Sequence, residues 1–410
     1  MQYITEQNQV PVLGSFDVVV SGGGVAGVAA ALSARRAGKS VLLLEKSVTL
    51  GGLATLGLIN YIEPLCNGRG VQIMRGMAQE FLDLAVRYGF DTIPPEWKDG
   101  LPDGPAQARY VTRYSPNLCA IALAKLLMDE GVDMLLDTLA VKPVMEGGHC
   151  RGVTVENKTG RGFYACRVVI DATGDADLLF RAGVPTVQGK NYFSYSAKQI
   201  SLESCKKAVE TGRINDAITP VRGGGALLSG KNQPEGRRLY GGVTAQDVTE
   251  YVLDNQMILL DRLKDDERFS RELVTLPGMA QFRTTRRIDG DYTLKPEDAY
   301  RHFDDSVCAI SDFTHRDLLY EVPYRCLINQ GFGNLLTAGR CASGTGWAWD
   351  VLRVIPPAIL TGQAAGLAAA HAIDEGCAVS GVNIQRLQGA LAKSDVLIHF
   401  DDSLIPAKTE

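Results

Sequence analysis

The sequence predicts a two-lobed α/β protein whose central parallel sheet is interrupted by insertions. Residues 17–44 contain a strand-like stretch, then a glycine-rich turn, an alanine-rich stretch and a second strand-like stretch. Alternating β-type runs occupy 132–170, and an apolar run at 334–337 leads into another alanine-rich stretch. A chain of 410 residues is also too long for one ordinary core. These observations together predict a discontinuous sheet domain with an inserted α+β lobe.

The N-terminal part is predicted to be a βαβ unit. The apolar run 17–21 reads as a strand, and the helical stretch 25–37 ends at Gly38, a residue suited to a helix C-terminus. The next run, 40–44, is continuously apolar, as in a parallel strand that is buried on both faces. The order strand, tight turn, helix and strand within about 30 residues is typical of this unit.

The later elements follow the same rules. A helix is expected over 115–131, with Pro116 in its first turn. Residues 132–170 predict an antiparallel meander that returns to a strand at 168–170, and a last helix is expected over 357–375. We expect the sheet domain to consist of three parts, at 1–58, 115–189 and 325–377. A cap segment is expected at 59–114, a substrate lobe at 190–324 and a C-terminal segment at 378–410.

Two of these segments have distinctive compositions. The cap segment is rich in loops, with Pro102 and Pro105 among its prolines. In the substrate lobe, a helix is expected over 245–264, and the glycine-rich stretch 222–226 is expected to be a loop.

The composition indicates a small-molecule partner. A net charge of −5 and a pI near 5.7 favour neither nucleic acid nor an anionic membrane surface. The sequence shows no signal peptide and no apolar run of about 20 residues, so we expect a cytoplasmic protein without a membrane span. Nine scattered cysteines without a C-x-x-C pair indicate reduced thiols and no metal centre. An oligomer is compatible with these features.

A G-x-G-x-x-G turn follows the first strand and opens the first helix. Gly22 permits the tight turn, Gly24 lets the backbone approach a pyrophosphate, and Gly27 lets the helix pack against the strand. Val25 and Ala26 complete the motif at the helix N-terminus, where backbone N–H groups and the helix dipole favour phosphate.

Glu45 strengthens the prediction of a dinucleotide site. It lies 21 residues past Gly24, at the end of the second strand, where a carboxylate accepts hydrogen bonds from ribose hydroxyls. The alternative is a solvated glutamate at a strand end.

Three further motifs occur in the order found in flavoproteins. Gly51-Gly52 follows the ribose acid, Ala172-Thr173-Gly174-Asp175 ends the returning strand, and Gly339-Arg340 precedes the last helix. The chain thereby resembles two-dinucleotide-binding flavoproteins of the glutathione-reductase type. This resemblance implies FAD in a Rossmann-like FAD-binding domain, with further cofactor contacts from Lys46, Leu53, Ala54, Thr55, Val141, Val354 and Ile355. Covalent attachment of the FAD stays open, with non-covalent binding as the default.

Other motifs narrow the resemblance to the FAD-dependent oxidoreductase family. They lie at 283–294, 322–325, 339–343, 353–356 and 362–366. The family includes the flavin subunit of heterodisulfide reductase and is related to flavoproteins of the fumarate-reductase type. This chain lacks the cysteine clusters of the former, and it has an aromatic stretch at 347–350 where a histidine is expected.

The candidate catalytic residues are those expected near the flavin: Arg353, Asp350, Tyr324, Arg325 and Arg283. The arginines are candidates for binding a substrate anion, with structural ion pairs as the alternative. Tyr324 and Asp350 are candidate acids or bases, and packed structural roles are the alternative.

Several other side chains lie near these motifs. Arg283, Thr285 and Arg287 would share one face if their run is a strand. Trp347 and Trp349 are candidates for stacking a substrate, and Tyr61 and Cys66 are candidates for reaching the cavity. His302 and His315 have no metal-type partner at a suitable spacing in the sequence, so we expect no metal site there.

The leading functional hypothesis is an FAD-dependent oxidoreductase. It would dehydrogenate or reduce a small organic substrate, with an anion as a candidate, by hydride transfer at flavin N5. One alternative is a flavin electron-transfer subunit of a larger redox complex, and another is an RNA-modifying flavoprotein. The electron acceptor stays open.

Overall fold

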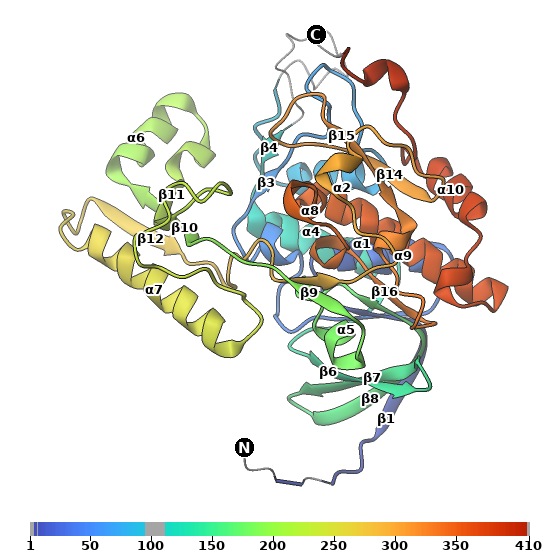
Figure 1. The fold of residues 1–410 in the computed structure, drawn as a ribbon. Coiled ribbons are helices and arrows are strands. Elements are labelled where there is room, and N and C mark those ends of the chain that lie inside the picture. Colours follow the sequence, from blue (N-terminus) through green and yellow to red (C-terminus); the bar gives the residue numbers. More distant parts are fainter. Residues whose placement is uncertain (1–3, 6, 95–110, 408–410) are drawn as a thin grey trace.

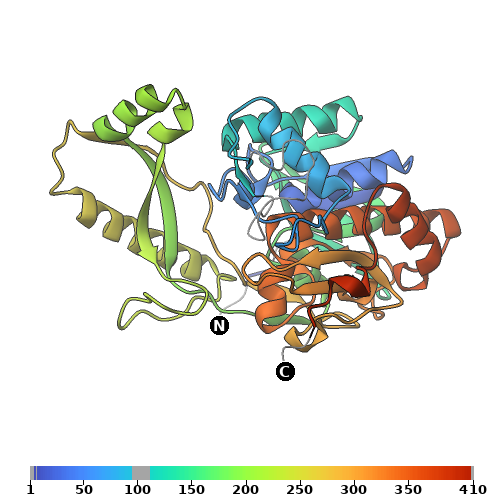
Figure 2. The same cartoon turned by 90° about the horizontal axis from the view of Figure 1, so that it is seen from above.

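A computed structural model describes residues 4–5, 7–94 and 111–407 of the chain (Figure 1). Pro102 and Pro105 of the cap segment lie outside these residues. A domain around one large sheet and a smaller lobe of three strands and two helices are set apart from each other in Figure 2. The predicted two-lobed α/β fold is therefore confirmed.

The large sheet has the predicted parallel core. Its strands run in the order β5 (Asp133–Leu135), β2 (Val41–Leu44), β1 (Val12–Ser21), β8 (Gly160–Asp171), β7 (His149–Asn157) and β6 (Leu139–Glu146). The first four strands are parallel to one another, whereas β8 pairs antiparallel with β7, and β7 with β6, to form the meander that the sequence predicts. Because β8 is long, its first half pairs with β7 and its last residues pair in parallel with β16 (Leu335–Thr337).

Helices α1 (Val25–Arg36) and α9 (Ile355–Glu375) form the buried centre of the helical layer. They pack backbone against backbone, because a Cβ at Gly362 would lie 2.2 Å from the carbonyl oxygen of Ala26. Gly366 makes the same close approach to Ala30, at 2.2 Å. Helices α2 (Met77–Arg87) and α4 (Pro116–Asp129) pack against this pair and against each other.

The second lobe is built on the sheet β11–β10–β12, formed by Thr219–Gly225, Ser194–Ser201 and Arg271–Thr275. Helices α6 (Leu202–Thr211) and α7 (Ala245–Leu263) complete it. The expectation of a loop at 222–226 is wrong, because β11 includes Gly223 and Gly224. Here the glycines permit close packing on α7: a Cβ at Gly223 would lie 2.6 Å from the carbonyl oxygen of Asn255.

Short elements connect these parts. Among the described residues, the remaining strands and α-helices are β3 (Tyr61–Ile62), β4 (Thr112–Arg113), α5 (Asp177–Ala182), β9 (Thr186–Gln188), β13 (Arg286–Ile288), β14 (Ser306–Ser311), β15 (Leu319–Pro323), α8 (Gly346–Leu352) and α10 (Ile384–Lys393). The 3-10 turns are η1 (Gly52–Ala54), η2 (Ile214–Ala217), η3 (Pro296–Asp298), η4 (Tyr324–Cys326), η5 (Gly339–Cys341), η6 (Val379–Gly381) and η7 (Asp402–Leu404).

The six-segment division of the chain stays a prediction. Helix α2, from the cap segment, packs against α4 and α9, and β14, from the expected substrate lobe, packs against α9 and α10. Among the described residues, no single helix is long and apolar enough to cross a membrane. Within the same described part of the chain, only α8 and α9 taken together are long and apolar enough for a membrane span, and the chain bends by 77° between them.

The contact between α1 and α9 leads to a prediction for two glycines inside helices. Gly362→Ala should lower the thermal unfolding midpoint of the FAD-loaded protein, because the added methyl group overpacks the interface at a cost of about 1–3 kcal/mol. Gly389→Ala is the matched control: a Cβ at Gly389, inside α10, would meet no atom within 4 Å. This control should keep or raise the midpoint, since alanine favours a helix over glycine by about 1 kcal/mol. Equal shifts in calorimetry would contradict the proposed backbone contact.

Candidate flavin site

The glycine turn between β1 and α1 has the geometry that its sequence predicts. Gly22 has φ 103°, and a Cβ there would lie 2.4 Å from the carbonyl oxygen of Ala172. A Cβ at Gly27 would lie 1.8 Å from the carbonyl oxygen of Gly22, so this residue sets the distance between helix and turn. A Cβ at Gly24, in contrast, would meet no atom within 4 Å. The backbone at Gly24 therefore faces open space, as a pyrophosphate requires.

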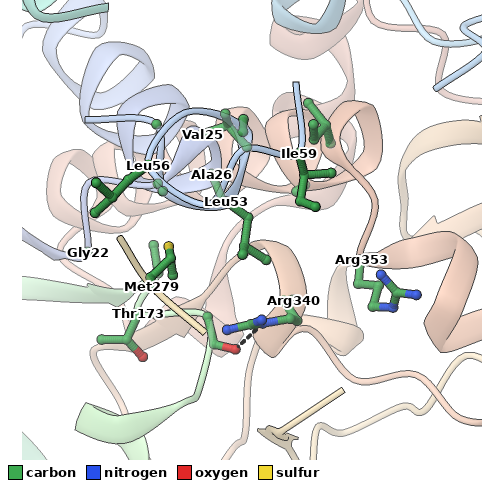
Figure 3. Close-up of a pocket in the computed structure, with 18 of the residues that line it drawn as sticks. Gly22, Val25, Ala26, Leu53, Leu56, Ile59, Thr173, Met279, Arg340 and Arg353 are labelled. Carbon is green, nitrogen blue, oxygen red and sulfur yellow. Dashed lines mark hydrogen bonds between the residues drawn. The ribbon is translucent and has the colours of Figure 1, made fainter. Parts of the chain in front are cut away.

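That open space belongs to a cavity of about 340 Å³, shown in Figure 3. Most of the predicted cofactor-binding residues line it: Gly22, Gly24, Val25, Ala26, Glu45, Lys46, Gly51, Gly52, Leu53, Ala54, Ala172, Thr173, Gly174, Arg340, Val354 and Ile355. Gly22 and Thr173 lie at one end in Figure 3, and Arg353 lies at the other. Helix α1 begins at the cavity with no side-chain cap and no acidic residue in its first turn, which leaves its N-terminus suited to an anion.

Glu45 lies at the predicted ribose end of this cavity. Its carboxylate accepts hydrogen bonds from the backbone N–H groups of Gly23, at 2.6 Å, and Ser47, at 2.7 Å. These two bonds orient the side chain and leave acceptor capacity on both oxygens, as ribose hydroxyls would need.

The Gly51-Gly52 pair lines the cavity next to the glycine turn. The N–H of Gly51 donates to the carbonyl oxygen of Gly23 at 2.8 Å, and both glycines have positive φ. A Cβ at Gly52 would lie 3.1 Å from the Cα of Gly24 and would occupy the cradle itself. Thr55 does not line the cavity; its hydroxyl donates to the carbonyl oxygen of Leu50 at 2.5 Å and thus supports the loop from behind.

Arg340 connects the flavin-site loops to the second lobe. Its Nε donates to the carbonyl oxygen of Gly174 at 2.6 Å, as drawn in Figure 3, and its Nη2 pairs with Asp175 at 2.8 Å. Its Nη1 donates to the carbonyl oxygen of Phe282, and the hydroxyl of Thr285 donates to Asp175. The predicted residues Arg340 and Asp175 thus hold the 173–175 loop in place, and only Arg340 of the two reaches the cavity wall.

Three other predicted cofactor residues do not line the cavity. Gly27 and Gly339 support it through close packing against the glycine turn and against Ala26. Val141 lies in β6, and its carbonyl oxygen accepts a hydrogen bond from Arg181. Its neighbour Ala140 lines a small side cavity of about 50 Å³.

A second cavity, of about 370 Å³, adjoins the first. The two share the lining residues Leu53, Ile59, Glu63, Arg353 and Val354, and the second extends to β10 and β11 of the smaller lobe. Its described lining carries five basic side chains against one acidic side chain: Arg113, Lys198, Arg222, Arg283 and Arg353 against Glu63. Tyr61 also lines this cavity, whereas Cys66 is buried outside it.

The basic residues of the second cavity differ in how they are paired. Arg353 donates from Nε and Nη2 to one carboxylate oxygen of Asp350, at 2.9 and 2.6 Å. Arg283 and Lys198 have no ion pair with a carboxylate among the described residues; Arg283 has only long contacts, to Ala226 and Ser194 at 3.4 and 3.5 Å. Burial lowers the pKa of both Arg283 and Lys198, and the neighbouring positive charges of Arg353 and Arg113, respectively, lower it further.

Asp350, Tyr324 and Arg325 line neither cavity. Asp350 is the ion-pair partner of Arg353. The hydroxyl of Tyr324 donates to the carbonyl oxygen of Val379 at 2.8 Å, and burial raises its pKa. Arg325 pairs with Asp305 at 2.9 Å on the surface. These packed and paired arrangements match the structural alternatives that the sequence left open, so the three residues take no part in the function proposed below.

The expectation of one arginine face at 283–287 is wrong. Strand β13 covers only Arg286–Ile288, so Arg283 and Arg287 do not alternate on a common strand. Arg283 reaches the second cavity, whereas Arg287 donates to the hydroxyl of Ser343 at 3.0 Å and lies over the ring of Trp349. Trp347 and Trp349 line neither cavity; Trp349 donates to the carbonyl oxygen of Arg340 at 3.0 Å.

Glu63 is a candidate functional residue that sequence reasoning missed. It follows β3, is buried where the two cavities meet, and its Oε2 accepts no hydrogen bond within normal distance from any residue that the structure describes. Burial raises the pKa of Glu63 to about 7, against the opposing effects of its own backbone N–H, the charge of Arg353 and the nearby backbone N–H of Ile355. The sequence does contain a signal, since Glu63 is the only charged residue within 47–68.

Sequence spacing gives His302 no metal-type partner, but the fold brings two potential ligands next to it. Its Nδ1 lies 2.5 Å from Oε1 of Glu321, and Nδ1 of His399 lies 3.0 Å from Oε2 of the same carboxylate. Spacing along the chain did not reveal this group because β15 and the C-terminal segment bring its members together. His315 contacts Asp312, at 3.3 Å, and is not part of the group.

Comparison with known proteins identifies the family of this chain. The family profile described as FAD dependent oxidoreductase matches residues 17–218 and 251–391, which is most of the chain. An L-aspartate oxidase of Mycobacterium leprae is 29% identical over 195 residues, which cover 40% of this chain and 37% of that protein. The chain thus matches well under half the length of this curated relative.

Two solved structures resemble the chain over nearly its full length. A geranylgeranyl bacteriochlorophyll reductase-like protein of Thermoplasma acidophilum has a TM-score of 0.46 at 14% identity, with 95% of this chain and 94% of that chain covered. A p-nitrophenol 4-monooxygenase of Pseudomonas putida has a TM-score of 0.47 at 13% identity, with coverages of 95% and 91%. On the extent of the profile match, this chain belongs to the FAD-dependent oxidoreductase family and is an enzyme that uses FAD.

Proposed function

We propose that this enzyme oxidises or reduces a small organic anion in the second cavity, by hydride transfer at the flavin. The observation that carries this proposal is the junction of the two cavities, where a basic pocket meets the flavin site beside a buried carboxyl group. A ligand in the second cavity would therefore lie next to the flavin end of the first. The volume of about 370 Å³ falls in the range of small-molecule sites.

The charge of the second cavity favours an anionic substrate. Arg283 and Lys198 have no carboxylate partner among the described residues, so a bound anion would supply the missing counter-charge. A guanidinium binds a carboxylate through two parallel hydrogen bonds, which adds orientation to attraction. Arg353 contributes less net charge because Asp350 already pairs with it. Arg113 and Arg222 are exposed, whereas Lys198 is buried and Arg283 half-buried, so Arg283 and Lys198 are the proposed anion-binding pair.

Glu63 is the proposed proton-transfer residue. When bound, FAD supplies a two-electron acceptor that takes a hydride at N5. Dehydrogenation also releases a proton from the substrate, and the unpartnered Oε2 of Glu63 is available to accept it. In the reverse reaction the protonated carboxyl group would return that proton. A pKa of about 7 suits both roles near neutral pH.

The named relative supports the same class of substrate. L-aspartate oxidase is named for a small molecule that carries carboxylate groups, and part of its sequence matches this chain. We therefore propose small carboxylates, amino acids among them, as the first compounds to test. The alternative function, a flavin electron-transfer subunit, would behave differently, since its flavin would not be reduced by such compounds alone.

The anion-binding role can be tested with Arg283→Gln. We expect the concentration of carboxylate that half-saturates anaerobic flavin bleaching to rise roughly 10- to 100-fold, because a charged hydrogen bond contributes about 1.5–3 kcal/mol. Arg268→Gln, an exposed change in the same lobe, is the control and should leave this concentration unchanged. An equal concentration for Arg283→Gln and the wild type would remove Arg283 from the substrate site.

The role of Glu63 can be tested through the pH dependence of flavin reduction. Because its pKa is raised to about 7, the proton-accepting carboxylate dominates only above that pH, so the anaerobic rate of dehydrogenation should rise through about pH 7 and then level off. Glu63→Gln should lower the plateau by roughly 10²–10⁴-fold and remove the rise. Glu203→Gln, an exposed change on α6, should keep both features. A rise that survives in Glu63→Gln would assign the titration to another group.

A further inference from the structure

A group of four side chains, which we call the His302 cluster, lies on the sheet domain away from both cavities of the flavin site. It consists of His302, Glu321, His399 and Asp402. His302 precedes β14, Glu321 lies in β15, and the other two come from the segment after α10; Figure 1 shows β14, β15 and α10 close together. Three distant parts of the chain thus meet at one point.

Glu321 is a buried carboxylate whose neighbouring donors are mainly imidazoles. Its side chain is 0% exposed, and Oε2 accepts from the backbone N–H of Phe303 at 2.8 Å. Among the described residues, only His302 and His399 form ion pairs with it, and both do so only when protonated. A buried carboxylate without a permanent cation is unfavourable, so this position requires a positive charge nearby.

His302 lies between two carboxylates. Its Nδ1 is 2.5 Å from Glu321, and its Nε2 is 2.8 Å from Oδ1 of Asp402. A neutral imidazole has one N–H and cannot donate on both sides. The geometry thus needs either an added proton or a metal cation on the Glu321 side of the ring.

We propose that the His302 cluster binds a divalent metal ion of the Zn²⁺ class. The ligands are Nδ1 of His302, Nδ1 of His399 and a carboxylate oxygen of Glu321, a set of two imidazoles and one carboxylate that suits zinc. Asp402 accepts the Nε2–H of His302 and orients the ring, which is the usual role of a carboxylate behind a metal-bound histidine.

The distances are compatible with this assignment after a small opening. The three ligand atoms lie within 4.8 Å of one another. Tetrahedral zinc, with bonds of about 2.0–2.2 Å, places its ligand atoms roughly 3.3 Å apart. Nδ1 of His302 lies 2.5 Å from Oε1 of Glu321, and Nδ1 of His399 lies 3.0 Å from the other oxygen, Oε2, so each imidazole must move away from its oxygen by less than about 1 Å to admit the ion. Both histidine side chains can adjust, because they are 42% and 45% exposed.

A metal ion in this place would fasten the C-terminal segment to β15. The segment is already held at Leu397 and Ile398, whose carbonyl oxygens accept from the backbone of Ala309, at 2.6 Å, and the hydroxyl of Ser306, at 2.7 Å. Phe400 packs in a small apolar cluster with Ala309. Metal bonds to Glu321 and His399 would add a cross-link beyond these contacts and would stabilise the folded state.

The test is a calorimetric titration of the FAD-loaded protein with Zn²⁺, together with its thermal unfolding midpoint. The wild type should bind one equivalent and unfold at a higher temperature with Zn²⁺. His302→Asn and His399→Ala should each weaken binding at least 100-fold and remove the shift in the midpoint. Asp402→Asn should weaken binding roughly 10- to 100-fold, because it acts through His302.

His149→Gln is the matched control, since His149 is an exposed histidine outside the cluster. It should bind Zn²⁺ as the wild type does. The flavin spectrum of each variant verifies that it is folded, and two separate ligand variants guard against one that is not. Unchanged binding in folded His302→Asn or His399→Ala, or no saturable binding by the wild type, would overturn the proposal.

Discussion

The structure depends on the direct backbone contact between α1 and α9. Gly362 meets the carbonyl oxygen of Ala26, a residue in the first turn of α1, so the two helices cannot separate without opening the flavin cavity. Because α9 begins at Ile355, this contact also sets Val354 and Ile355 against the same cavity. Two helix N-termini that are more than 300 residues apart in sequence thus form opposite parts of one site. Both are free of acidic residues in the first turn, which suits an anionic dinucleotide.

The chemistry of the site follows from how its charges are compensated. Arg353 has Asp350 as its partner, whereas Arg283 and Lys198 have no carboxylate partner among the residues that the structure describes. Glu63 is buried at the junction with an unpartnered oxygen, and its raised pKa keeps it able to take up or release a proton near neutral pH. Binding of an anion and transfer of a proton are thereby assigned to different side chains within one continuous space.

The second lobe is positioned by polar contacts with the loops of the flavin site. Arg340 bonds the carbonyl oxygens of Gly174 and Phe282, and Thr285 bonds Asp175. These bonds connect a loop of the cofactor cavity to the segment that carries Arg283 into the substrate cavity. A change at Arg340 is therefore expected to affect both cavities, because one guanidinium supports a wall of each.

The sequence by itself determined the features that depend on local backbone geometry. The roles of Gly22, Gly24 and Gly27, the βαβ unit and the meander were all readable, because a tight turn or a buried strand restricts which residues fit nearby in the chain. Only the tertiary structure decided the rest. The isolation of Glu63 in a neutral stretch was visible, but its burial between two cavities depends on elements far along the chain. The strand at 219–225 and the partners of His302 were missed for the same reason: close packing and charge compensation arise between segments that sequence spacing does not relate.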